Sequence, residues 1–226
     1  MAVLGDRGVA GLLSALAEAP DFAAASSFLL TQLAEITAAP RCCLLRIDEP
    51  LENLRLVSCF GFDEGGAPPT ARVSVGDLSN PLIISTLSLL PARGDAPLSH
   101  RGLESLESFR PWLAVPLSQP RFRGAPETMG AQRAAELIAA PSITLLANGE
   151  RRLGVAPAGV ILLEGTFDDA TIEEAVDVVS LASPVLARLC SLEEARVVNT
   201  DPTRIRVASG LGRRTKYLVR RTRTCR

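Results

Sequence analysis

The sequence predicts an α/β (α+β) domain with a central, mostly antiparallel sheet of five to six strands flanked by helices. Two helical patterns and two short apolar runs open the chain. Two further apolar runs, residues 112–117 and 158–166, have the length of strands, and a long amphipathic segment over residues 168–197 closes the pattern. The chain has 226 residues, 47% of them hydrophobic, which is enough to bury one sizeable core.

The first sixty residues predict two helices followed by a hairpin. Apolar residues recur at helical spacing from Val9 to Leu16, and Pro20 ends this N-terminal helix, which we assign to residues 1–20. Asp21 is placed to cap a second helix that runs to residue 37. Residues 41–48 and 54–60 are two short runs separated by residues 49–53, which is the pattern of two strands joined as a hairpin.

The middle of the chain, residues 61–110, is rich in Gly, Pro, Ser and Asp but contains an apolar patch at 81–90. This mixture predicts short helices and loops that lie over the sheet. Residues 112–117 follow as a central strand, which we expect to be short because Pro116 lacks a backbone N–H. Residues 118–152 are expected to form an insert, with a helix over 129–140 and an extra strand over 142–147 ending at a hairpin turn, Asn148-Gly149.

The last helix has the clearest local pattern. Thr171 and Glu174 fit a capping box, which predicts where the helix begins. Pro184 is expected to kink it. An apolar stripe follows at helical spacing: Ile172, Val176, Val179, Ala182, Leu186 and Leu189.

The succession of a strand ending in Val115-Pro-Leu117, a polar excursion, the strand Gly159-Val-Ile-Leu-Leu-Glu-Gly165 and a closing helix resembles the core of a GAF domain. GAF domains are small-molecule sensory domains of bacterial signalling and transcription regulators, and the resemblance implies a GAF/PAS-like sheet flanked by helices. The resemblance extends over residues 21–197. It implies that residues 61–110 cover one face of the sheet as the lid of a ligand pocket.

The resemblance also implies two sets of functional residues. The candidate pocket residues are Phe60, Asp77, Leu82, Ile84 and Trp112. For Asp77 and residues 80–87, capping and ordinary core packing are equally good explanations. The first and last helices of such domains commonly pair in a homodimer and continue towards an output domain, which makes Ile172, Val176, Val179, Leu186 and Leu189 candidate dimer contacts. Packing of this stripe within one chain is the alternative.

Nothing in the sequence nominates a reaction. It contains no GxSxG, Walker, HExxH or dinucleotide-binding pattern. One branch of the resembled family reduces free methionine sulfoxide with paired pocket cysteines, but Cys42, Cys43 and Cys59 fall on predicted strands, where cysteines are usually buried. We therefore expect no enzyme, and a small-molecule sensor or, alternatively, a ligand-free interaction scaffold.

Cofactors and metals are equally undefined. His100 reads as a solvated loop residue, and Asp63 with Glu64 as a charged turn. The Asn-Lys-Phe-Asp-Glu pattern of cyclic-nucleotide-binding members is missing, and no cysteine lies near a histidine as in bilin-binding members. The cofactor is left unknown, and we expect no metal site because the cysteines show no CxxC spacing.

The ends of the chain guide the expected location and partners. The N-terminus lacks a signal-peptide pattern and no apolar run reaches membrane-spanning length, which predicts a cytoplasmic protein with no membrane contact. Nine basic residues and no acidic ones follow residue 201, so residues 198–226 form a basic tail. We expect a disordered tail or a truncated linker; nucleic-acid contact through it is the least favoured function.

Overall fold

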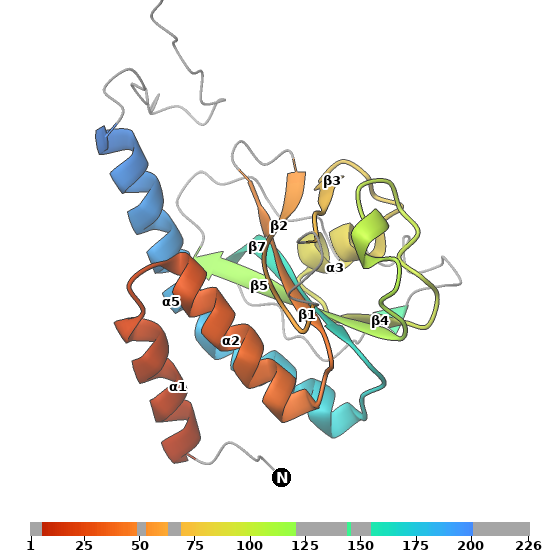
Figure 1. The fold of residues 1–226 in the computed structure, drawn as a ribbon, viewed down its shortest axis with the longest axis horizontal. Helices are drawn as coiled ribbons and strands as arrows, with labels where there is room; N and C mark the ends of the chain where they lie inside the picture. The colour runs from red at the N-terminus through yellow and green to blue at the C-terminus, as the bar shows by residue number, and fades with distance from the viewer. Residues whose placement is uncertain (1–5, 49–52, 63–68, 121–143, 146–154, 201–226) are drawn as a thin grey trace, which may run out of the picture.

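The computed structural model describes residues 6–48, 53–62, 69–120, 144–145 and 155–200 (Figure 1). The predicted helix at 129–140, the Asn148-Gly149 turn, Asp63, Glu64 and residues 201–226 of the basic tail lie outside these residues. In chain order the elements are α1 (Asp6–Glu18), α2 (Phe22–Thr37), β1 (Cys42–Ile47), β2 (Asn53–Phe60), β3 (Arg72–Ser74), α3 (Pro81–Ser88), β4 (Ala92–Gly94), the 3-10 turn η1 (Glu104–Leu106), β5 (Trp112–Pro120), β6 (Thr144–Leu145), β7 (Val155–Glu164) and α5 (Asp169–Thr200).

The strands form one antiparallel sheet in the order β3-β2-β1-β7-β5-β4-β6. Six of them have three residues or more, and β6 is a two-residue edge strand. The predicted α+β class, with an antiparallel sheet flanked by helices, is therefore confirmed. The hairpin β1–β2 pairs as expected, with Cys43 opposite Cys59.

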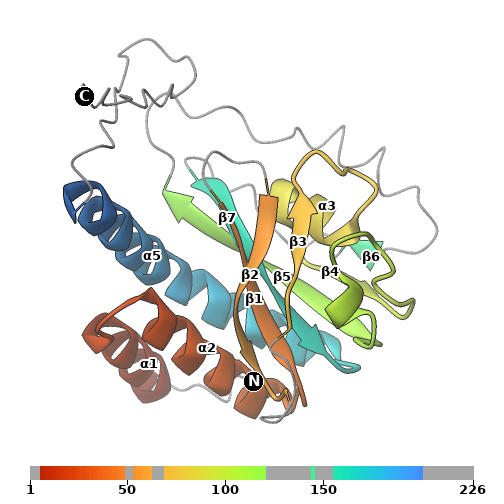
Figure 2. The same ribbon diagram turned by 45° about the horizontal axis from the view of Figure 1, so that its top comes forward.

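Three helices cover one face of the sheet, and Figures 1 and 2 show α1, α2 and α5 together on that side. Their apolar faces meet alternate residues of the central strands in one buried cluster, which we call the helix-side core. It contains Leu29 and Leu33 of α2, Leu44 of β1, Leu113 of β5 and Ile161 of β7. The i, i+4 spacing on α2 and the period of two on the strands produce this arrangement directly.

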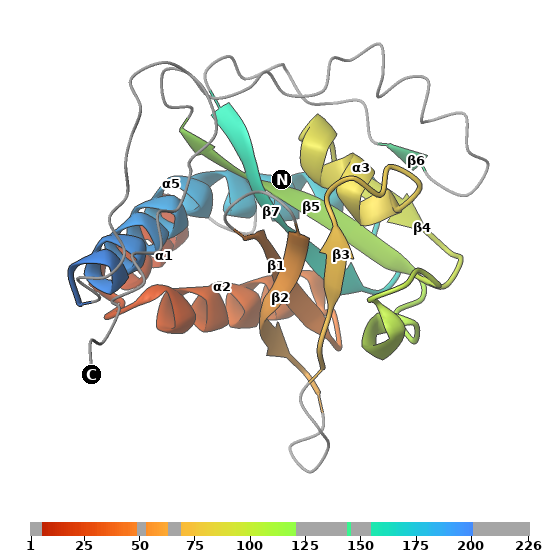
Figure 3. The same cartoon turned by 90° about the horizontal axis from the view of Figure 1, so that it is seen from above.

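The opposite face is covered by residues 80–88, which contain α3, and by residues 95–111 (Figure 3). We call these two segments together the cap. Cys43, Leu45, Leu162 and the Trp112 ring point from the sheet into this second cluster. The cap fills the cluster from outside with Leu82, Ile83, Leu98, Leu103, Leu106 and Phe109. We call this cluster the cap-side core.

Several local expectations need correction. The strand that begins at Trp112 runs through Pro116 to Pro120, so it is longer than predicted and includes the first residues of the expected insert. Its register with β4 covers only Trp112 to Ala114, so Pro116 lies beyond that pairing and does not interrupt it. The residues of β6 pair with β4 and not with β7, the next strand in the chain.

The start of α5 also differs from the prediction. The carboxylate of Asp168 accepts a hydrogen bond from the backbone N–H of Thr171 at 2.8 Å, so Asp168 is the capping residue and Thr171 lies within the first turn. Hydrogen bonds from the Thr171 hydroxyl and amide lower the pKa of Asp168 because they favour its ionised form. The helix continues through Pro184 to Thr200 as one element.

The segment Asp169–Glu193 of α5 is apolar and long enough to span a membrane by length and composition. Its apolar side nevertheless packs into the helix-side core, where Ile172, Val179 and Leu186 are buried. A core helix of a globular domain has this combination of length and one-sided burial.

Candidate functional site

The cap brings some of the predicted pocket residues together and excludes one. Leu82 and Trp112 meet in the cap-side core, with exposed fractions of 0% and 3%. Ile84 is also buried, but it belongs to neither of the two clusters of described residues. Phe60 lies opposite Cys42 in the register, and the Cys42 side chain points into the helix-side core. Phe60 is therefore on the other face of the sheet from Trp112, with 38% of its surface exposed.

Asp77 organises the approach to α3, but it does not cap the helix. Its carboxylate accepts from the backbone N–H and the hydroxyl of Ser79, at 3.2 and 2.6 Å. The N-cap residue of α3 is Asn80, whose Oδ1 accepts a hydrogen bond from the N–H of Leu82 at 2.9 Å. Asn80 followed by Pro81 is a helix-start signal that the sequence contains, because asparagine favours the N-cap and proline the first turn.

Asn80 has a second property that sequence alone could not reveal. Its side chain is fully buried, and its Nδ2 group has no hydrogen-bond partner among the described residues. A buried amide donor without a partner costs about 1–3 kcal/mol, so proteins rarely leave one unsatisfied. The group is therefore a donor that a bound molecule with an acceptor oxygen or nitrogen could satisfy.

The Trp112 ring is fixed on both sides. Its Nε1 donates to the carbonyl of Ala96 in the cap at 2.9 Å. Gly94 lies directly opposite on β4, and a Cβ atom there would come within 2.6 Å of the indole ring. The glycine thus makes room for the indole, and the ring joins the sheet to the first residues of the cap.

An arginine joins the cap to the end of the sheet. The Arg41 guanidinium binds the Glu164 carboxylate through Nε at 2.5 Å and a second nitrogen at 2.7 Å, and it donates to the hydroxyl of Ser108 at 2.9 Å. It also lies 4.9 Å from the centre of the Phe109 ring and 5.6 Å from that of Phe62. This two-pronged ion pair, covered by aromatic rings, fixes the last residues of the cap before β5.

The cysteines are poorly suited to chemistry. Cys43 and Cys59 are opposed on β1 and β2 and face the cap-side core, while Cys42 faces the helices. Burial raises the pKa of Cys42 to about 12, and burial together with nearby Cys59 raises the pKa of Cys43 still further. These thiols stay protonated near neutral pH, and the thiolate is the nucleophilic form. None of the four cysteines among the described residues forms a disulfide.

The five apolar residues predicted as dimer contacts face the chain's own core. Ile172, Val179 and Leu186 are buried in the helix-side core, and Val176 and Leu189 pack against it partly buried. One chain therefore accounts for the stripe. Among the side chains of α5 that the structure describes, the exposed large apolar ones are Leu181 and Leu192, with 39% and 47% of their surfaces accessible.

The remaining candidates have structural surroundings. His100 lies in a turn where its carbonyl accepts from the N–H of Leu103 at 3.0 Å. Within the described ranges, no group of three or more His, Cys, Asp or Glu side chains is placed to hold a metal ion. The polar feature of the cap that has no structural explanation is the amide of Asn80.

No family model and no curated protein matches the chain by sequence. Solved structures do match its fold. The GAF domain of a phosphoenolpyruvate-protein phosphotransferase from Acinetobacter superposes with a TM-score of 0.54 at 12% identity, over 85% of this chain and 98% of that one. The corresponding GAF domain from Coxiella burnetii gives 0.52 at 13% identity, over 84% and 94%.

A third match is a methyl-accepting chemotaxis protein, residues 122 to 287, with a TM-score of 0.51 at 10% identity, over 80% of this chain and 98% of that one. At these identities the likeness concerns the fold. It agrees with the resemblance in the order of strands and helices. The chain has the fold of a GAF domain.

Proposed function

We propose that this chain is a non-catalytic regulatory domain that binds a small molecule between the sheet and the cap and relays its state through α5. The observation that carries the proposal is the buried Nδ2 group of Asn80, which has no partner among the described residues. A ligand with a carbonyl, carboxylate or ring-nitrogen acceptor would satisfy it. The cap-side core beneath the cap is apolar, and small-molecule sites are usually lined mainly by apolar side chains.

Relay through α5 follows from what the sheet connects. The strands β5 and β7 contribute Trp112 and Leu162 to the cap side and Leu113 and Ile161 to the helix side, where α5 packs. A ligand that shifts the cap changes the support under these strands and hence under α5. Because packed interiors respond to displacement as connected units, the helix is placed to transmit that change.

The first experiment is native mass spectrometry of the full chain purified from its source, combined with thermal shift against a panel of metabolites. We expect a discrete added mass and a stabilisation that grows with ligand concentration. Asn80→Ser keeps a capping oxygen for α3 but removes the amide donor, so it should reduce the ligand-induced shift. Asn53→Ser makes the same substitution at the start of β2, outside the proposed site, and is the matched control that should leave the shift unchanged.

A ligand-free interaction scaffold of the same fold is the second candidate. It is favoured by the apolar filling of the cap-side core, to which Leu98, Leu103, Leu106 and Phe109 contribute fully buried side chains. The scaffold becomes the better explanation if the chain carries no added mass, shows no thermal shift, and is no more stable than its Asn80→Ser variant.

We further propose that two copies associate through the exposed side of α5 and that the protein acts in the cytoplasm. Leu181 and Leu192 supply the exposed apolar contacts. Light scattering should then report a dimer that Leu181→Glu, Leu192→Glu or both convert to a monomer. A monomeric parent chain would remove this part of the proposal.

Nucleic-acid contact through residues 202–226 is the least favoured function. It predicts an affinity that falls steeply with salt and disappears when that segment is deleted. Affinity that survives the deletion would place any nucleic-acid contact elsewhere on the chain.

A further inference from the structure

Three arginines occupy directly opposed positions on three neighbouring strands. Arg46 of β1 lies opposite Arg55 of β2, and Arg55 lies opposite Arg72 of β3. Opposed residues of antiparallel strands point to the same face, so the three side chains form one row across the sheet. We call this row the arginine ladder. Its neighbours along β1, Leu45 and Ile47, point into the cap-side core, which places the ladder on the helix face.

The described residues do not neutralise this ladder. Ion pairs among them are formed by Arg41 with Glu164 and by Arg93 with Asp169, and neither includes a ladder residue. Like charges directly opposed on neighbouring strands destabilise a sheet. Within the part of the chain that the structure describes, the row is therefore an unfavourable arrangement that an anion would relieve.

Two acidic groups among the described residues on this side, Asp48 and Glu193, have other partners. Asp48, two positions after Arg46 on the same face, accepts from the backbone N–H of Asn53 at 2.9 Å. Glu193 of α5 accepts from the backbone N–H of Phe22 at 2.9 Å, at the start of α2. Neither carboxylate lies within ion-pair distance of a ladder residue.

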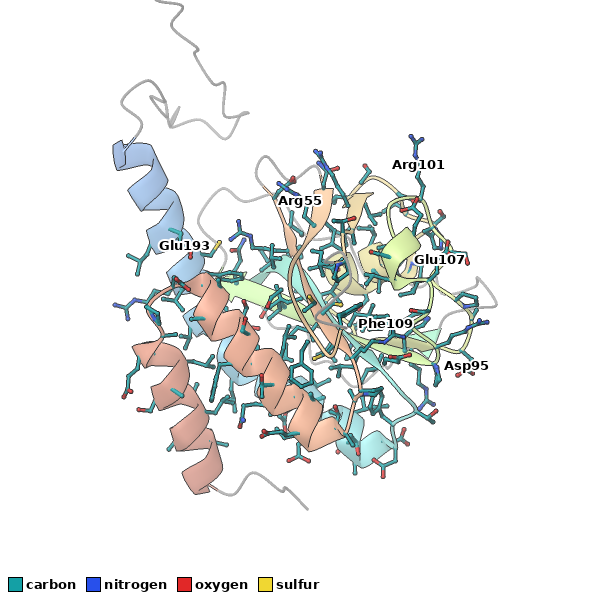
Figure 4. All side chains as sticks on the ribbon, viewed as in Figure 1. Arg55, Asp95, Arg101, Glu107, Phe109 and Glu193 are labelled. Carbon is teal, nitrogen blue, oxygen red and sulfur yellow. The ribbon has the colours of Figure 1, made fainter. Side chains whose placement is uncertain are left out.

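The ladder is accessible and anchored at one end. Arg55 and Arg72 are exposed, and Figure 4 shows Arg55 projecting from the sheet at the same end of the molecule as Glu193. Arg46 is half-buried, with its guanidinium 2.7 Å from the Cys190 sulfur and 5.2 Å from the centre of the Phe22 ring. With a strand spacing of about 4.8 Å, the row spans roughly 10 Å between its outer Cα atoms.

We propose that the arginine ladder binds a compact anion that carries two or more phosphate groups. Guanidinium groups match phosphate oxygens with two parallel hydrogen bonds, and three of them in a row require more charge than a single phosphate supplies. The site is separate from Asn80, which lies in the cap on the other face of the sheet. Either a nucleotide or inorganic polyphosphate could provide this chemistry.

The test is calorimetric titration of the full chain with sodium tripolyphosphate at low ionic strength. We expect saturable binding that weakens as salt rises and much weaker binding of inorganic phosphate. Arg55→Gln and Arg72→Gln should each weaken tripolyphosphate binding about threefold to tenfold, and the double variant further. Arg101→Gln is the control, since it removes the same charge from an exposed loop position outside the ladder.

The unliganded variants provide a second readout. Because substitution relieves like-charge repulsion, Arg55→Gln and Arg72→Gln should unfold at the same temperature as the parent or higher. A purely structural role predicts lower unfolding temperatures and unchanged affinity. Equal affinity in all variants, or equal weakening by Arg101→Gln, would overturn the proposal.

Two further titrants identify the anion. Adenosine triphosphate that binds more tightly than tripolyphosphate indicates a nucleotide, whereas equal or weaker binding indicates inorganic polyphosphate. Both results support a phosphate site. Binding of a hexaglutamate peptide without any binding of tripolyphosphate would overturn the assigned chemistry.

Discussion

Each face of the sheet carries a buried apolar core, but the two cores are built differently. On the helix side, regular helices supply apolar residues at fixed spacing, and Leu29, Leu33 and Val179 have no accessible surface. On the cap side, a short helix and irregular chain do the same work with the help of Asn80, Trp112 and Arg41, which form specific polar contacts. Helical periodicity can complete a core without polar groups, whereas irregular backbone needs side chains to satisfy and position it.

This difference indicates where function can arise. On the helix side, the buried hydroxyls of Ser26, Thr37 and Ser183 each donate to a carbonyl of their own helix. The cap has a donor left over at Asn80 and is held at its two ends by Trp112 and by Arg41 with Glu164. A covering segment held at defined points can adjust between them, which suits a site that responds to a ligand.

The largest effect is expected from truncation on the helix side. Leu29→Ala removes a fully buried side chain from α2 and should lower the free energy of unfolding by about 2–5 kcal/mol. The matched change in the cap, Leu98→Ala, should cost less because irregular chain can move to fill the cavity. Urea unfolding of both variants measures the difference, and equal losses would contradict the contrast between the two faces.

The next effect concerns the cap anchor. Glu164→Gln removes the charge that faces Arg41, and we expect a loss of about 1–3 kcal/mol in the free energy of unfolding because the pair is mostly shielded from solvent. Asp169→Asn breaks the exposed pair with Arg93 and should change stability far less. Double-mutant cycles with Arg41→Gln and Arg93→Gln isolate the two coupling energies. If the coupling energy of Arg41 with Glu164 is no larger than that of Arg93 with Asp169, the Arg41–Glu164 pair does not anchor the cap.

Alkaline pH should selectively weaken the cores at β1. Burial raises the pKa of Cys42 from 9.0 to about 12, so the unfolded thiol ionises while the folded one keeps its proton. Stability is then fully present below about pH 9 and falls as pH rises towards 12, by up to about 1.4 kcal/mol per pH unit for this group. Tyrosine and lysine side chains also titrate at alkaline pH, and the chain has one of each.

Urea unfolding between pH 8 and pH 10.5 measures this slope. Cys42→Ala should reduce it and leave the contribution of Cys43, whose pKa is also raised by burial. In the same range a thiol reagent should modify Cys59, which is partly exposed, before Cys42 and Cys43. Faster modification of Cys43 than of Cys59 would mean that the cap opens readily in solution.

The smallest effect tests the start of α5. Asp168→Ala removes the carboxylate that accepts from Thr171 and should lower the midpoint of urea unfolding slightly. Thr171→Ala leaves the backbone N–H of residue 171 and the N-cap residue Asp168 in place, so its effect should be smaller. The stabilities of the parent and of Asp168→Ala should converge as pH falls below 3.8. The pKa of Asp168 is lowered in the folded protein, so its contribution to stability is lost when the carboxylate is protonated. The reverse order of the two variants would restore the capping box as the true start.

The local sequence was sufficient for the elements whose pattern is regular. The observed elements were predicted by the spacing of apolar residues in α1, α2 and α5, by the N-cap at Asp21, and by the two short runs separated by a turn at β1 and β2. These signals are local because one helix face or one strand face decides them. The same signals failed at the ends, since Asp168 and Thr171 offer competing caps and only the backbone geometry selects between them.

The candidate site depended on tertiary structure. A strand residue's face follows from register, which placed Phe60 with Cys42 and away from Trp112, and aligned Arg46, Arg55 and Arg72 in one row. Whether a polar group is satisfied depends on distant chain, as Asn80 demonstrates. The sequence by itself determined the fold class, the regular helices and the central strands, because those rest on short-range periodicity. Only the tertiary structure decided which side chains meet, because contacts between segments far apart in the chain set burial, pairing and charge.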